Sequence, residues 1–108
     1  MPRILLLAAR QPELAELLED AGYEVELRTR PLDGEPLEAD VAIVFRGRLI
    51  GRAQAPTLVE WGIPVVEVLT GPATSPSTAD WIRLSGRIAK PDLVQIVHAL
   101  ADRAKNSG

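Results

Sequence analysis

The chain has 108 residues, of which 46% are hydrophobic, enough to fill the core of one small domain and too many for a disordered chain. Its formal net charge of −3 comes from 12 Lys and Arg against 15 Asp and Glu, so no broad basic surface indicates a nucleic-acid partner. The absence of cysteine excludes disulfides, thiol catalysis and thiolate metal sites, and a single histidine cannot build a multi-histidine metal site.

Strand and helix patterns alternate along the chain. The first apolar run, at residues 4–9, predicts a strand buried on both faces and is too short for a membrane span or a signal-peptide core. We therefore expect a cytoplasmic protein that does not contact a membrane. The remaining expected strands are 23–27, 40–45, 63–69 and 87–89, and the expected helices are 12–21, 54–61, 76–85 and 92–104.

This alternation predicts an α/β fold with a five-stranded parallel sheet covered by helices on both faces. We expect one domain over residues 1–104 and a disordered tail at 105–108. Ligands of open parallel sheets bind beyond the carboxyl ends of the strands, so the side chains there are the candidates for function. These residues are Ala9, Arg10, Phe45, Arg46, Thr70 and Lys90.

Several segments resemble the receiver domain of bacterial response regulators. ILLLAARQPELAELLEDAGYEVE is similar to that family's first strand, first helix and second strand, DVAIVF to its third strand and GIPVVEVLT to its fourth. IAKPDLVQIVHALADR is similar to its fifth strand, Lys-Pro junction and last helix. The resemblance implies a flavodoxin-like three-layer sandwich with strand order 2-1-3-4-5. It also implies a cis bond between Lys90 and Pro91.

The chemistry of the receiver family depends on carboxylates that this chain lacks. The family is phosphorylated on a carboxylate that ends the third strand, next to an acidic pair that holds Mg²⁺. In this chain Phe45 stands at the position of the phosphorylated residue, and Ala9 and Arg10 stand at the acidic pair. Thr70, or alternatively Leu69, matches the family's hydroxyl residue. The resemblance therefore implies a pseudo-receiver without catalytic residues, metal or cofactor.

Lys90 matches the lysine that neutralises the phosphoryl group in the family. Without acidic neighbours, a buried unpaired lysine is costly, so Lys90 should reach solvent or pair with a new partner. Lys90 could also form a cationic pocket with Arg10 and Arg46, near Arg48, and bind a small anionic ligand. Such an anion sensor is the alternative function.

The first functional hypothesis is a non-enzymatic signalling module that docks on a protein partner or on a second copy of itself. In the family, the fourth helix, fifth strand and last helix form such a surface, which makes Trp81, Arg87 and His98 the candidate interface residues. We expect Trp81 in the helix at 76–85, where it could equally pack at the edge of the core. An enzyme is the weakest reading, because no nucleophile, base or metal cluster converges.

Two further polar residues have structural readings. Glu67 interrupts an apolar strand, and we expect it either to form a structural ion pair with a nearby Arg or Lys or to mark the exposed end of the strand. His98 lies between apolar positions of the last helix, and we expect it either on the surface or at the boundary between core and surface.

Overall fold

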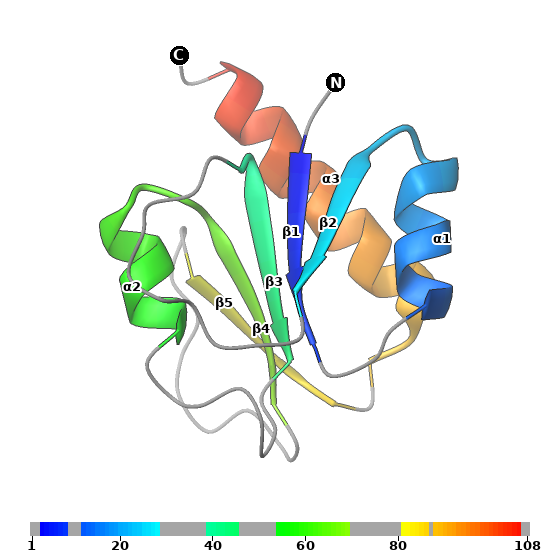
Figure 1. The fold of residues 1–108 in the computed structure, drawn as a ribbon, viewed down its shortest axis with the longest axis horizontal. Helices are drawn as coiled ribbons and strands as arrows, with labels where there is room; N and C mark the ends of the chain where they lie inside the picture. Colours follow the sequence, from blue (N-terminus) through cyan, green and yellow to red (C-terminus); the bar gives the residue numbers. More distant parts are fainter. Residues whose placement is uncertain are drawn as a thin grey trace.

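A computed structural model of the chain describes residues 3–8, 12–28, 39–45, 54–69, 81–86 and 88–106 (Figure 1). The described residues form five strands and three helices. The strands are β1 (Arg3–Leu7), β2 (Glu24–Arg28), β3 (Val41–Phe45), β4 (Val65–Leu69) and β5 (Trp81–Ser85), and the helices are α1 (Pro12–Asp20), α2 (Gln54–Glu60) and α3 (Lys90–Asn106).

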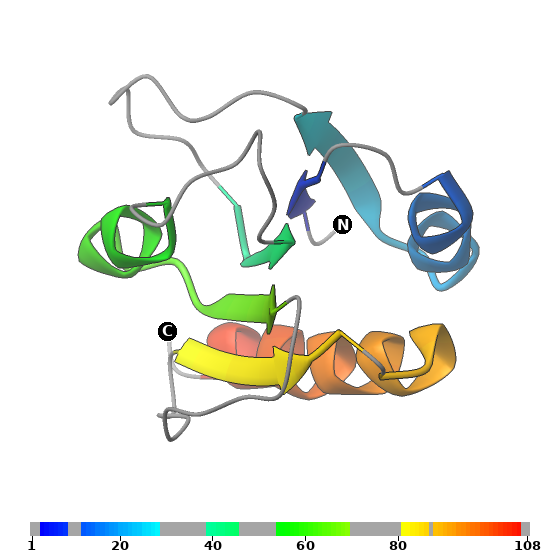
Figure 2. The same cartoon turned by 90° about the horizontal axis from the view of Figure 1, so that it is seen from below.

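The five strands form one parallel sheet in the order β2-β1-β3-β4-β5. Helices α1 and α3 cover one face of the sheet and α2 lies against the other (Figure 2). β1 and β3 are buried on both faces, which explains their uninterrupted apolar sequences. The α/β prediction, the strand order 2-1-3-4-5 and the flavodoxin-like architecture are confirmed.

Two apolar clusters hold the layers together. The larger cluster packs α1 and α3 against the sheet and includes Ile4, Leu18 and Val97, all without solvent exposure. The smaller cluster packs α2 against the opposite face through Leu58, with Trp61 and Trp81 at its margin. Alternating side chains of each central strand supply the two clusters, so β1 and β3 are fixed from both sides.

Helices α1 and α2 end in the same hydrogen-bonded turn. After α1, the amide of Gly22 donates to the carbonyl of Glu19 and that of Tyr23 donates to Leu18, at 3.0 and 3.1 Å. After α2, Gly62 donates to Val59 and Ile63 to Leu58, both at 3.0 Å. The two glycines have φ of 97° and 80°, the left-handed conformation that closes a Schellman turn.

The position of the last strand differs from the prediction. Trp81 lies in strand β5 and not in a helix, and residues 88 and 89, which were expected to be strand, belong to neither a strand nor a helix. The segment WIRLS alternates, with Ile82 and Leu84 packing against the larger cluster and Trp81 facing the smaller one. Side chains that alternate between two faces in this way are typical of a strand and not of a helix. Residues 76–80 of the expected helix lie outside the described residues.

The start of the last helix also differs from the prediction. No peptide bond among the described residues is cis, so the Lys90–Pro91 bond is trans. The helix begins at Lys90, two residues early, and the amide of Leu93 donates its bond to the carbonyl of Ala89. Pro91 therefore falls in the first turn, where its missing N–H costs nothing and where a helical backbone requires a trans bond. α3 continues to Asn106, two residues beyond its expected end.

Candidate functional site

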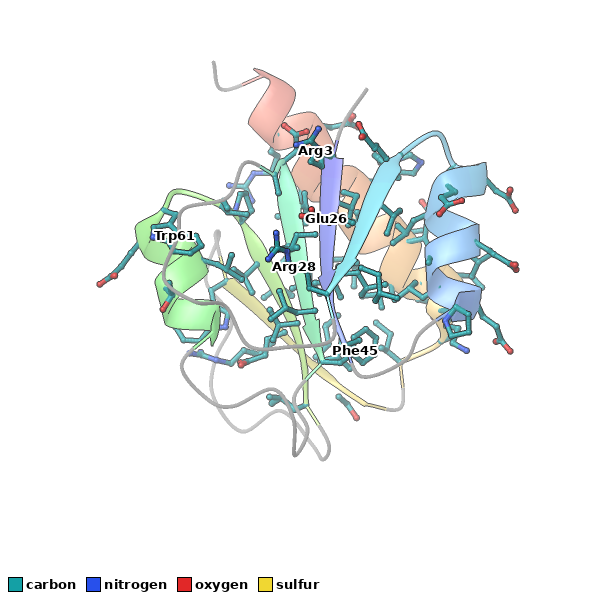
Figure 3. All side chains as sticks on the ribbon, in the orientation of Figure 1. Arg3, Glu26, Arg28, Phe45 and Trp61 are labelled. Atoms are coloured by element: carbon teal, nitrogen blue, oxygen red, sulfur yellow. The ribbon has the colours of Figure 1, made fainter. Side chains whose placement is uncertain are left out.

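The topology places the candidate site beyond the carboxyl ends of β1 and β3. These two strands are neighbours, but the chain leaves β1 through α1 on one face and leaves β3 through α2 on the other. Ligands of open α/β sheets bind at this switch in strand order. The described residues at the ends of the two strands are Ala8, which is fully buried, and Phe45, which is half-buried (Figure 3).

Phe45 ends the central strand β3 with a hydrocarbon ring. Its side chain points to the same face as Val41 and Ile43, and it packs against the larger cluster below α1 and α3. A phenyl ring can neither attack phosphorus nor ligate a cation, because it has no lone pair to donate. The end of β3 therefore offers packing at the position where an acyl phosphate would need a carboxylate.

Lys90 is paired with a carboxylate on a different helix. Its Nζ donates a 2.6 Å hydrogen bond to Oε2 of Glu13, which joins the first turn of α3 to the first turn of α1. Both side chains are exposed, at 41% and 76%. The hydrogen bond and the positive charge of Lys90 lower the pKa of the Glu13 carboxyl below its ordinary value. The expectation that Lys90 reaches solvent or finds a new partner is confirmed, since it does both.

The identity of that partner was not predicted. Glu13 is exposed on α1, but the sequence gives no distance between two residues that stand 77 positions apart at the starts of two helices. The usable signal is topological: helices that follow β1 and β5 both begin at the carboxyl edge of the sheet. An acidic residue in one first turn and a lysine in the other are then candidates for an ion pair.

The remaining predicted pocket residues lie outside the described part of the chain: Ala9, Arg10, Arg46 and Thr70. The cationic pocket of Arg10, Arg46 and Lys90 therefore stays a prediction, as does the contribution of Arg87 to an interface. Within the described ranges, no group of three or more His, Asp or Glu side chains could hold a metal ion.

A second polar cluster joins β4 to β5 on the α2 face of the sheet. Glu67 is only 3% exposed, and its Oε1 lies 3.6 Å from Nε of Arg83. The same Oε1 accepts a 3.3 Å hydrogen bond from the indole N–H of Trp81. The Arg83 guanidinium stacks 4.0 Å from the centre of the Trp81 ring. The expected structural ion pair of Glu67 is confirmed, and its partners follow from the register that sets Glu67 beside Arg83.

His98 lies half-buried on α3, at the boundary, which was one of its two expected positions. Its Nδ1 and the Tyr23 hydroxyl are joined by a hydrogen bond, and the two rings meet edge to face at 5.2 Å and 61°. Burial, and secondarily the negative charge of Asp102, raise the pKa of Tyr23. This contact ties α3 to the start of β2. Trp81 and His98 both make internal contacts, so their role in docking stays a prediction.

Comparisons with known proteins leave the site to be judged on its geometry. No protein-family model matches the chain, and no curated protein is significantly similar to it. Of the helices in the described ranges, none has the length and apolar character that crossing a bilayer requires.

Proposed function

We propose that the protein is a receiver-like signalling module that is not phosphorylated and that acts by docking on a protein partner or on a second copy of itself. One observation carries this proposal: Phe45 ends the central strand at the switch in strand order, where an acyl phosphate would require a carboxylate. The neighbouring Ala8 is apolar as well.

The pairing of Lys90 favours docking over the anion sensor. Lys90 already donates to Glu13 at 2.6 Å, so an incoming anion would have to compete with a carboxylate for the same ammonium group. The two arginines of the hypothetical pocket, Arg10 and Arg46, lie outside the described residues. We therefore place docking first.

The proposal predicts that the chain is not phosphorylated by acetyl phosphate in the presence of Mg²⁺. Intact-mass spectrometry should show no gain of one phosphoryl group, while a phosphorylatable receiver domain treated in parallel gains one. The variant Phe45→Asp should also remain unmodified, because Ala9 and Arg10 occupy the positions of the acidic pair and cannot hold Mg²⁺.

A Mg²⁺-dependent mass gain in the wild-type chain that disappears on changing a single Asp would refute the proposal. Phosphorylation of Phe45→Asp alone would show that the acidic pair has a substitute elsewhere in the chain. The second result would still agree with a wild-type chain that is not phosphorylated, but it would show that residues other than Ala9 and Arg10 stand at the Mg²⁺ site.

A further inference from the structure

The outer edge of β2 is a strand edge with no partner among the described strands. β2 stands at one end of the sheet, and no described helix lies beyond it (Figure 2). The carbonyl of Arg28 accepts a bond from Ala8, so it points toward β1. Backbone groups alternate along a strand, so Val25 and Leu27 direct their N–H and C=O groups outward.

The side chains along this edge differ between the two faces of the sheet. On the face of α1, Val25 is half-buried and Leu27 is 45% exposed. On the opposite face, Glu24 and Glu26 are exposed and Arg28 follows them, with Arg28 3.5 Å from Glu26 and Arg3 of β1 3.6 Å from Glu24 (Figure 3). The strand EVELR thus begins with an acid and ends with a base, and its two apolar residues, Val25 and Leu27, stand on either side of Glu26.

We propose that the outer edge of β2 pairs in antiparallel fashion with the β2 edge of a second copy, around a two-fold axis that passes at Glu26. In this register Val25 lies opposite Leu27 of the second copy. These are the two residues with outward backbone groups, so each pair exchanges two N–H···O bonds. The two sheets then continue into one another.

The charges of β2 favour this register. Glu24 lies opposite Arg28 of the second copy, and Arg28 lies opposite Glu24 of the second copy, on the same face of the joined sheet. Exposed Leu27 gains an apolar neighbour on the other face. The one like-charge pair is Glu26 with its symmetry mate at the axis, and each Glu26 has its own Arg28 at 3.5 Å. The charged edge is therefore complementary to itself.

This interface is small, so the dimer should be weak and should form at high protein concentration. It supplies a surface and a partner for the docking function proposed above, but it depends only on β2. Phosphorylation by acetyl phosphate would refute the proposed function but would not affect the proposed dimer. A chain that stays monomeric would refute the dimer but would not affect the proposal that the chain is not phosphorylated.

Sedimentation equilibrium tests the proposal on the whole chain. With concentrations rising to about 1 mM, the average mass should rise from the 11.7 kDa of one chain toward twice that value. E24R places two cations opposite each other at both ends of the pair, and R28E places two anions there. Each variant should raise the dimer dissociation constant at least about tenfold.

An equimolar mixture of E24R and R28E is the decisive sample. At one end the introduced arginine faces the introduced glutamate, and at the other end native Arg28 faces native Glu24. The mixture should therefore form a heterodimer although each variant alone is a monomer. A folding defect in either variant cannot produce this recovery.

Leu27→Lys should weaken the dimer by adding a charge to the pairing edge, and Leu17→Lys provides the matched control. Among the described residues Leu17 is the other exposed large apolar side chain, at 37%, but it lies on α1. Its substitution should leave the dimer unchanged. The proposal is wrong if the wild type stays monomeric throughout, if the mixture stays monomeric, or if the dimer survives E24R, R28E and Leu27→Lys.

Discussion

At the scale of single residues, the pair of Glu13 and Lys90 can be tested through the acid. Lys90→Met should raise the pKa of the Glu13 carboxyl toward its ordinary value, because the hydrogen bond and the charge that lower it are both removed. The measurement is an NMR titration of the Glu13 side-chain carboxyl. Arg28→Met, which removes a cation paired with Glu26 instead, should leave the Glu13 titration unchanged.

The same pair links to stability with a defined sign. Because the folded-state pKa of Glu13 is depressed, its contribution is present above the unfolded pKa and is lost as the pH falls through the folded pKa. Both side chains are exposed, so the contribution is small and screened by salt. A Glu13 pKa that does not respond to Lys90→Met would contradict the hydrogen bond on which this account depends.

Tyr23 gives a second titration at the opposite end of the pH scale. Its pKa should lie above the ordinary value of 10.0, chiefly because the ring is buried and secondly because Asp102 is negative. The chain has one tyrosine, so the ultraviolet absorbance of tyrosinate reports it directly. Asp102→Asn should lower the pKa of Tyr23 part of the way toward its ordinary value. The decrease should be smaller than the increase that burial causes.

The corresponding stability has the opposite sign to that of Glu13. A raised folded-state pKa means that the contribution of Tyr23 is fully present below the unfolded pKa and is lost as the pH rises through the folded pKa. Denaturant unfolding of the wild type above pH 10 should therefore show a loss of stability that Tyr23→Phe lacks. Equal losses in both proteins would contradict the assignment.

At the scale of elements, the contact between β4 and β5 depends on a buried charge. Arg83→Met should destabilise the fold by about 3 kcal/mol, the low end for a broken buried pair because Arg83 is 20% exposed, since it removes the cation that lies 3.6 Å from buried Glu67. The double variant Glu67→Leu/Arg83→Met should recover most of this loss, since apolar side chains need no counter-charge. Urea denaturation measures both.

The exposed ion pair of β2 provides the control for this prediction. Arg28→Met removes the partner of Glu26 at nearly the same distance, 3.5 Å, but both side chains are exposed, so the cost should be about 0.5 kcal/mol. Equal costs for Arg28→Met and Arg83→Met would show that burial does not govern the β4–β5 pair.

The same element shows where sequence reasoning succeeds and fails. The strands β1, β3 and β4 are predictable because their apolar runs are bounded by turn residues. The helix expected at 76–85 was the wrong prediction for β5, because a serine followed by proline at positions 75 and 76 of the sequence is typical of a helix start, whereas the alternation of WIRLS is typical of a strand. For the same reason the partners of Glu67 could not be predicted, because Trp81 and Arg83 lie beside its carboxylate only when they belong to a strand paired in register with β4.

At the scale of the whole molecule, the alternation of strands and helices was sufficient to predict a five-stranded parallel sheet, whereas its strand order came from the resemblance to receiver domains. The candidate site was predictable in position, through Phe45 and Lys90, but not in its contacts. The Glu13–Lys90 pair joins residues far apart in sequence, and only the placement of α1 and α3 on one face brings them together. Sequence patterns indicate which side of a helix or strand a residue lies on. The distance between residues on two different helices depends on how the helices pack against the sheet.

The two-cluster core predicts one cooperative unfolding transition. β1 and β3 contribute to both clusters, so neither face can lose its helices without exposing the strands that support the other. Far-ultraviolet circular dichroism should coincide with tryptophan fluorescence in Trp61→Phe and in Trp81→Phe, each of which retains one indole. Two separated transitions in either variant would contradict a single domain.

The matching turns after α1 and α2 have a consequence for how the chain could be altered. Each helix is left through the same pair of backbone bonds and the same left-handed glycine, although one turn leads to an outer strand and the other to an inner one. Neither glycine has a neighbouring atom within 4 Å of where a Cβ would stand, so backbone geometry alone requires it. The two turns therefore have the same main-chain structure and could be exchanged for one another. The position that the following strand takes in the sheet depends only on the side chains around each turn.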